Sequence, residues 1–277
     1  MASRQEQEGM ALTNGLAAQP ASVRPRRDVR WWFWLRRVMR DLTPAMLIYF
    51  LFAAYRLWRP SYASEAGARH AADVIALQSA LGLNVDRDWQ QAALGWPWLI
   101  RAANWFYIVG WAPVLLGIAI LAFVRAPVLL DRWRVVLSLS ATATALVQAA
   151  YPLAPPRLYQ PSGTIDTLVR FGPTYYGTVG DESGVINTYG AMPSMHVGWA
   201  LLAVLLLHAI LPHRPWLTVL SILYVATITW TVIVTGNHYL LDPVIGVAIV
   251  LACTGIAWIG LRWRIRRPIR LSARLRA

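Results

Sequence analysis

Two histidines stand at the openings of apolar stretches of this chain, where polar side chains are costly to keep. His196 lies in AMPSMHVGWALL, and His238 follows forty-two residues later in TGNHYLLDP. His238 and Asp242 are four residues apart, so they share one face if this stretch is helical. A carboxylate bonded to one imidazole nitrogen fixes the tautomer and raises the basicity of the other nitrogen, as a nucleophile or base requires. The equally weighted alternative from this motif alone is that Asp242 caps the helix that begins at Pro243.

An anion site is indicated by two further groups. Ser194 and His196 lie at the start of an apolar stretch, where free backbone amides and the helix dipole favour a negative charge. Arg157, in YPLAPPRLY, follows another apolar stretch, and its planar fork donates two parallel hydrogen bonds to phosphate oxygens. Taken singly, these residues would be an N-cap, an interfacial histidine and a solvated loop arginine. Because the His238–Asp242 pair is predicted on the same membrane face, these separate explanations become weaker.

The composition places the chain in a bilayer. Of 277 residues, 57% are hydrophobic and only 14% are charged, against about 25% charged in a soluble domain. Fifteen tryptophans favour the membrane–water interface. The net charge is +13 and all 26 basic residues are arginine, clustered at the ends and beside apolar stretches. That distribution is typical of lipid anchoring and topology control, so nucleic acid is not a predicted partner.

The sequence predicts an all-α, polytopic membrane protein with a bundle of six transmembrane helices and an interfacial N-terminal helix at 31–41. The predicted spans are 43–58, 97–124, 134–151, 194–211, 217–235 and 243–262. With six spans, the arginine-rich ends share one side with the loops at 125–133 and 212–216. By the positive-inside rule that side is the cytoplasm, which puts both polar motifs on the outer face.

Three domains are predicted: a disordered basic cytoplasmic tail at 1–30, a six-helix membrane catalytic domain at 31–262, and a basic cytoplasmic tail at 263–277. Within the outer segment 59–96, the stretch 65–91 has a helical period with a polar face and predicts a helix lying along the interface. The outer loop 152–193 is long enough to be functional. Arginine as the sole basic residue indicates a GC-rich genome, which favours a bacterial plasma membrane.

The order Arg, Ser-x-His, His-x-x-x-Asp resembles the type 2 phosphatidic acid phosphatase superfamily of membrane phosphatases and phosphotransferases. PSMH is similar to that family's PSGH motif, and HYLLD to the end of its SRxxxxxHxxxD motif. The chain departs from the family where Ala150 replaces a lysine, Leu158 a proline and Val232 an arginine. YPLAPPR, AMPSMHVGWA and TGNHYLLD look more like the branch of inositol phosphorylceramide synthase, which raises the expectation of head-group transfer.

The resemblance implies metal-independent catalysis without a cofactor, through a phosphohistidine. It makes His238 the nucleophile, Asp242 its orienting acid and His196 the general acid and base. It also implies that Arg157, Ser194 and Asn237 hold the phosphate, with Asn237 standing in for the missing arginine of the third motif. The partner is then a membrane lipid: a lipid phosphate, a polyprenyl diphosphate or a phospholipid. Water and an alcohol such as inositol stay open as acceptors.

Three other interpretations compete with this one. Two histidines and a carboxylate are also a potential metal site. Ionisable groups in a membrane also mark transport paths, although here they gather at one face. A pure interaction protein is expected only if the histidines are dispensable, and nothing in the sequence sets the oligomeric state.

Overall fold

The computed structural model describes residues 63–173 and 188–266 without interruption, and residues 31–54 only at scattered positions. The chain divides into two units, Met1–Arg40 and Asp41–Ala277, and the helices and the site described below belong to the second. The predicted interfacial helix at 31–41 and the first span at 43–58 are described only at scattered positions. The tail at 1–30 and most of the tail at 263–277 lie outside the described residues.

The described part of the chain is all-helical, without a β-strand. Its elements are α3 (Ala63–Ala80), α4 (Asp86–Leu94), α5 (Pro97–Val109), α6 (Ala112–Arg125), α7 (Pro127–Ala150), the short 3₁₀ turns η1 (Pro156–Leu158) and η2 (Gln160–Ser162), α8 (Thr167–Phe171), α9 (Met195–Ile210), α10 (Pro215–Val234) and α11 (Leu241–Arg266). Four of the long helices begin with proline in the first turn, where its missing N–H costs nothing.

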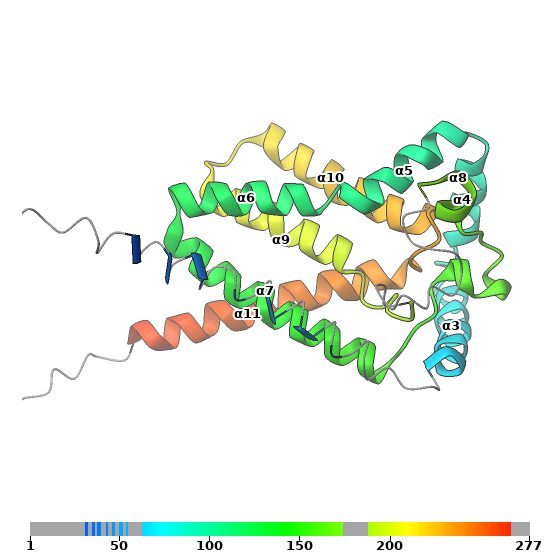
Figure 1. Ribbon diagram of the computed structural model, residues 1–277, viewed down its shortest axis with the longest axis horizontal. Coiled ribbons are helices and arrows are strands. Elements are labelled where there is room, and N and C mark those ends of the chain that lie inside the picture. The colour runs from blue at the N-terminus through cyan, green and yellow to red at the C-terminus, as the bar shows by residue number, and fades with distance from the viewer. Residues whose placement is uncertain are drawn as a thin grey trace, which may run out of the picture. The chain divides into compact units, whose positions relative to one another are not determined.

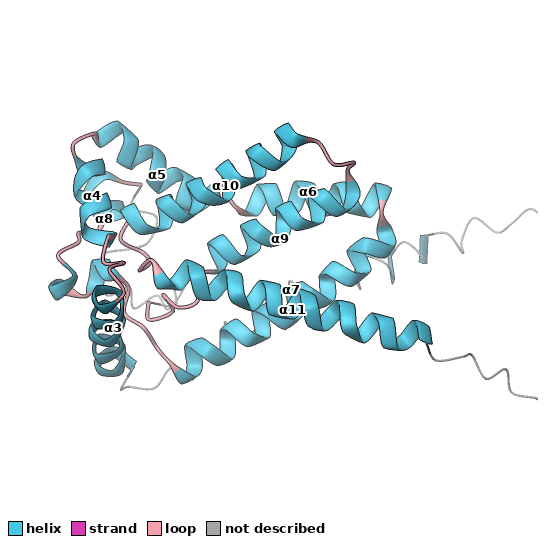
Figure 2. Ribbon diagram, turned by 180° about the vertical axis from the view of Figure 1, so that it is seen from behind, coloured by secondary structure: helices cyan, strands magenta, loops and turns pink. Residues whose placement is uncertain are grey.

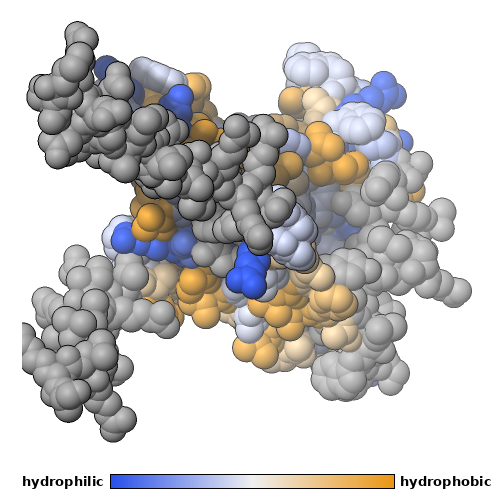
Figure 3. Space-filling view, turned by 60° about the vertical axis from the view of Figure 1, so that its left-hand side comes forward, coloured by the Kyte–Doolittle hydropathy of each residue, from blue (hydrophilic) through white to orange (hydrophobic). Residues whose placement is uncertain are grey.

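Two of these helices are long and apolar enough to cross a membrane: α10, and α11 over Leu241–Ile259. The pair α5 and α6 makes a third if the two together count as one bent span, and α9 is apolar but only 16 residues long. Large apolar side chains lie exposed along α6, α10 and α11, and Figure 3 shows such side chains on one face of the molecule. The six-span bundle therefore stays a prediction, of which the described helices supply up to three spans by length and composition.

The span predicted at 97–124 corresponds to two helices, α5 and α6, which meet at an angle of 41°, so it stays a prediction in the form of one bent span. The break falls at Gly110, where a Cβ atom would lie 2.4 Å from the carbonyl oxygen of Phe106. The Gly110 carbonyl accepts a hydrogen bond from the Tyr224 hydroxyl at 3.0 Å, which ties the break to α10. The next helix, α6, begins at Ala112, directly after Trp111, and has Pro113 in its first turn.

The stretch 65–91, expected as one interfacial helix, lies in two helices instead, α3 and α4. The chain turns between α3 and α4 at Gly82, whose φ of +68° disfavours any other residue. Figures 1 and 2 show α3, α4 and α8 gathered at one end of the longer helices.

That end is where the chain brings its polar motifs together. α7 and α10 end there, and α9 and α11 begin there (Figures 1 and 2). α9 packs against α6, α7, α10 and α11, so it is the central helix. α9 and α11 approach closely at Gly246, where a Cβ atom would lie 2.3 Å from the Ser194 carbonyl oxygen. Small residues of this kind let helix backbones touch, which here draws the starts of both helices together.

Candidate active site

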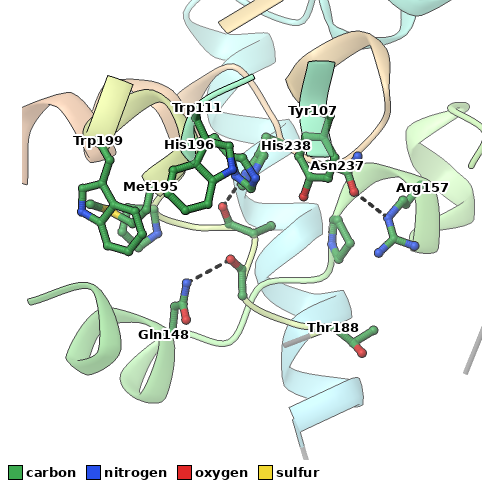
Figure 4. Close-up of a pocket in the computed structure, with 14 residues that line it drawn as sticks. Tyr107, Trp111, Gln148, Arg157, Thr188, Met195, His196, Trp199, Asn237 and His238 are labelled. Atoms are coloured by element: carbon green, nitrogen blue, oxygen red, sulfur yellow. Dashed lines mark hydrogen bonds between the residues drawn. The ribbon is translucent and has the colours of Figure 1, made fainter. Parts of the chain in front are cut away.

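A cavity of about 310 Å³ opens at the end where these helices meet. His196, His238, Arg157 and Asn237 all line it, and Figure 4 shows them with the aromatic side chains around them. The ring centroids of His196 and His238 lie 5.8 Å apart, with the ring planes at 64°. Four residues that the sequence predicted as site residues, separated by up to 81 positions, thus surround one space.

His238 is held in a single tautomer. Its Nδ1 lies 2.7 Å from the Ala191 carbonyl oxygen and 3.3 Å from Asp242 Oδ2. Because a carbonyl oxygen only accepts, Nδ1 carries the proton and the lone pair is left on Nε2. Burial lowers the pKa of His238 to about 4; the bond to Ala191 opposes this shift and the charge of Arg157 adds to it. At neutral pH the ring is therefore neutral, as a nucleophile must be.

Asp242 is completely buried behind His238 and does not line the cavity. Its Oδ2 accepts a 2.8 Å bond from the Tyr239 amide, three residues earlier in the chain. Because α11 already begins at Leu241, Asp242 lies within the first turn of the helix and is not the N-cap before Pro243 that the alternative interpretation predicted. The sequence motif predicted that Asp242 fixes the tautomer of His238. In the structure the nearer acceptor is a backbone carbonyl, that of Ala191, and Asp242 adds a longer contact.

Ser194 lies at the N-cap position of α9, but its side chain neither caps the helix nor lines the cavity. Its hydroxyl is fully buried and has no hydrogen-bond partner among the described residues. The Ser194 backbone links the start of α9 to the start of α11, because its amide donates to the Asp242 carbonyl oxygen at 3.0 Å. The predicted contact of Ser194 with phosphate therefore gains no support from its position.

His196 is enclosed by aromatic rings from the α5–α6 break. Tyr107 stacks on it with ring centroids 4.4 Å apart, and Trp111 presents an edge at 5.5 Å. Trp111 also contacts Trp199, one turn along α9 from His196. These ring contacts restrict the orientation of the imidazole. The break at Gly110 is what aims Tyr107 and Trp111 at His196.

Arg157 is positioned from two sides. Its Nε donates to Asn237 Oδ1 at 3.0 Å, and its Nη1 donates to Asp166 Oδ2 at 2.7 Å. The Arg157 amide also donates to the Gly236 carbonyl oxygen at 2.9 Å. Two of five guanidinium hydrogens are engaged in these side-chain bonds, so the fork retains donors for an anion.

Asn237 lines the cavity, but both the oxygen and the nitrogen of its side-chain amide form hydrogen bonds within the protein. Besides accepting from Arg157, it donates from Nδ2 to the Thr235 hydroxyl at 2.9 Å. This places Asn237 beside the guanidinium as a residue that orients Arg157, whereas the motif comparison predicted that it replaces a missing arginine.

The loop that carries His238 is fastened by the outer helices. Asp86 Oδ1 accepts from the Leu240 amide at 2.9 Å, and Gln78 Oε1 accepts from the Leu241 amide at 3.0 Å. Gln78 also donates to Asp86 Oδ2 at 2.5 Å. Burial raises the pKa of the Asp86 carboxyl to about 6, with the bonds from Gln78 and Leu240 opposing that shift. A buried carboxylate in this place costs free energy; Asp86 binds the Leu240 amide and orients Gln78, which binds the Leu241 amide.

The segment that supplies the Ala191 carbonyl is also fixed on both sides. The Leu153 amide donates to the Tyr189 carbonyl oxygen at 2.7 Å, and Gln148 Nε2 donates to the Gly190 carbonyl oxygen at 3.1 Å. Among the residues that the structure describes, no three His, Cys, Asp or Glu side chains gather as ligands of a metal ion would.

Sequence reasoning missed Ala191, Tyr107, Trp111 and Asp166. Ala191 acts through its backbone, which no side-chain pattern reveals. Tyr107 and Trp111 lie in a continuous apolar stretch, where aromatic residues are typical of membrane interfaces. For Asp166 a signal existed, because an aspartate in an outer loop is a natural partner for a nearby arginine.

Comparison with known proteins identifies the family to which this site belongs. A family model described as PAP2 superfamily matches residues 72–256, a range that includes every residue of the site. The chain belongs to the PAP2 superfamily. This confirms the resemblance drawn from the motifs, and with the apolar helices it makes the chain an integral membrane protein of a phosphatase and phosphotransferase family.

One similar protein comes from the inositol phosphorylceramide synthase branch that the motifs resemble. Over 122 residues the chain is 30% identical to the inositol phosphorylceramide synthase catalytic subunit aur1 of Schizosaccharomyces pombe. The alignment covers 39% of this chain and 28% of that protein, so the chain matches only about a quarter of the relative's length. No solved structure matches the chain.

Proposed function

We propose that this PAP2 superfamily member transfers the phosphoryl-containing group of a membrane lipid through a phosphohistidine on His238. The observation that carries the proposal is the meeting of two imidazoles, 5.8 Å apart, in a cavity that Arg157 also lines. The neutral ring of His238 has a lone pair on Nε2 for attack, the second imidazole can transfer protons, and the guanidinium can bind the anion.

In the first step, His238 Nε2 attacks phosphorus. A P–N bond forms while the P–O bond to the leaving group breaks, and the electron pair leaves with that oxygen. His196 supplies a proton to the departing oxygen, and the bound phosphate anion stabilises the imidazolium that this requires. Arg157 holds the non-bridging oxygens, whose charge must be neutralised as the group moves.

In the second step, the acceptor hydroxyl gives its proton to His196 and attacks phosphorus, and the P–N bond breaks. His238 regains its lone pair, and the Ala191 carbonyl and Asp242 keep its Nδ1–H in place throughout. No metal ion or cofactor takes part in the proposed mechanism, because each proton and each charge is accounted for by these side chains.

A second candidate is favoured by the relative: head-group transfer, in which an alcohol in place of water accepts the phosphoryl-containing group. The similarity to an inositol phosphorylceramide synthase subunit supports it, as does the departure of the motifs at Ala150 and Val232 from the phosphatase pattern. Inositol-bearing lipids are then natural donors.

We further propose that the cavity opens on the extracytoplasmic face of a bacterial plasma membrane, with both termini in the cytoplasm. The arginine distribution supports this orientation. A thiol-reactive, membrane-impermeant reagent tests it with Arg87→Cys, a substitution at an exposed position of α4. The new thiol should be labelled from outside intact cells, whereas labelling only after lysis would reverse the orientation.

The function is tested with purified protein in vesicles that contain a phospholipid or a lipid phosphate. The wild-type protein should release the lipid alcohol, and His238→Ala and His238→Gln should lower the rate by at least about a thousandfold while melting normally. A folded His238 variant that keeps near-normal turnover would contradict the proposal. Adding inositol or another alcohol, and following new phosphodiesters by mass spectrometry, separates transfer from hydrolysis.

A further inference from the structure

Asp166 gives the cavity an unusual charge balance. Among the described residues that line the cavity, Arg157 alone carries a permanent charge. Asp166 does not line the cavity, yet its Oδ2 accepts the 2.7 Å bond from Arg157 Nη1. The two side chains are only 13% and 11% exposed, so solvent screens their attraction weakly. The charge of the guanidinium is thus largely balanced before any lipid binds.

Asp166 is itself held in place. Its Oδ1 accepts from the Val169 amide at 3.0 Å, where it caps the N-terminus of α8. The carboxylate therefore cannot swing away when an anion approaches Arg157 without giving up the helix cap.

The charges of the cavity suit one kind of phosphate. Arg157 and Asp166 cancel, and His238 is neutral because its pKa is lowered to about 4. Asp242 lies completely buried behind His238, and neither it nor its contact with His238 faces the cavity. His196 contributes a single positive charge when it acts as the acid. One positive charge matches a phosphodiester, which has one negative charge, whereas a phosphomonoester has about two at pH 7.

We propose that Asp166, acting through Arg157, makes this cavity select a phosphodiester lipid over a phosphomonoester lipid as donor. This inference rests on the proposed function and names its substrate class. In such a donor, His238 Nε2 forms the P–N bond, and the bond from phosphorus to the oxygen of the lipid alcohol breaks. The electron pair leaves with that oxygen, His196 supplies its proton, and the head group stays on phosphorus.

The test uses phosphatidylinositol and phosphatidic acid with identical acyl chains, under single-turnover conditions with the protein in excess. The first step then releases diacylglycerol from both donors, whichever acceptor follows. The wild-type protein should use the diester at least about tenfold faster. Asp166→Asn should narrow that ratio by about tenfold or more, which corresponds to about 1.4 kcal/mol, and Asp166→Glu should restore it.

Asp88→Asn is the matched control, because it removes the same charge from an exposed position of α4 outside the cavity and should leave the ratio unchanged. A purely positional role for Asp166 would slow both donors in proportion, and that outcome would overturn the inference. Faster use of phosphatidic acid by the wild-type protein would overturn it without any variant. Faster turnover of phosphatidic acid would contradict only the donor selectivity and would still agree with the proposed function. If neither donor yields diacylglycerol, both the proposed function and the donor selectivity are wrong.

Discussion

The close contact of α9 and α11 at Gly246 yields a strong prediction about how the site is built. In Gly246→Ala, the new methyl group would lie 2.3 Å from the Ser194 carbonyl oxygen and 3.1 Å from the Ser194 carbonyl carbon. Normal contact begins near 3.4 Å, so the starts of the two helices must move apart by about 1 Å. Both neighbours are backbone atoms and cannot rotate away.

Two costs result from that movement. Overpacking of a tight contact costs about 1–3 kcal/mol. The bond from the Ser194 amide to the Asp242 carbonyl oxygen, 3.0 Å long, would weaken at a further cost of about 1 kcal/mol. The free energy of unfolding should therefore fall by about 2–4 kcal/mol, and the melting temperature by roughly 5–15 °C. Because the movement separates His196 from His238, turnover should also fall by about a hundredfold.

The assay is thermal unfolding in detergent, together with lipid turnover at a temperature where the variant is folded. Gly255→Ala is the matched control on the same helix, since a Cβ atom there meets nothing within 4 Å. It should be neutral or stabilise by up to about 1 kcal/mol through helix propensity. If Gly246→Ala melts and turns over like Gly255→Ala, the contact of α9 with α11 does not position the two histidines.

Four further predictions concern the chemistry and the stability of the site. Arg157→Lys keeps the charge but loses the fork that Asn237 and Asp166 orient, so turnover should fall by about a hundredfold; a loss below about threefold would show that charge alone suffices. Because the pKa of His238 is lowered to about 4, kcat/KM for a phosphodiester donor should stay level as the pH falls from about 7 to about 5 and decline near pH 4; an acid limb centred near 6.5 would contradict a buried neutral nucleophile. The same shift means that the unfolded state binds a proton on His238 that the folded state does not bind. The free energy of unfolding of the wild-type protein relative to His238→Gln should therefore decrease as the pH falls from about 6.5 to about 4, a comparison in which the opposing contribution of the raised Asp86 pKa cancels. Turnover should survive EDTA, and a loss that zinc restores would favour a metal site.

Much of the helical framework was predictable from the sequence because apolar length and proline mark it. α9 and α10 lie within two residues of the predicted spans at 194–211 and 217–235. The break between α5 and α6 was not predictable in this way, because the stretch 97–124 is apolar on both sides of Gly110. A glycine inside an apolar helix is common in membranes, so the residue type alone does not reveal the 41° angle between α5 and α6.

The residues of the candidate site were likewise predictable only in part from the sequence. His196, His238 and Arg157 were found because titratable side chains at helix ends are rare and informative. The role of Asp242 was only partly foreseen, since helical spacing brings it near His238 but says nothing of the Ala191 carbonyl, 47 residues earlier in the chain. Ser194 shows the limit of motif reasoning, because its hydroxyl is buried away from the cavity although it lies two residues from a histidine that lines it.

Trapping the covalent intermediate tests the central claim most directly. The wild-type protein is mixed with a donor labelled with ³²P in its phosphate, quenched in alkali, which preserves phosphohistidine, and digested for mass spectrometry. We predict label on the peptide that contains His238, at up to one group per chain, and none in His238→Gln. Label on His196, or full turnover with no labelled protein at any time, would contradict the mechanism.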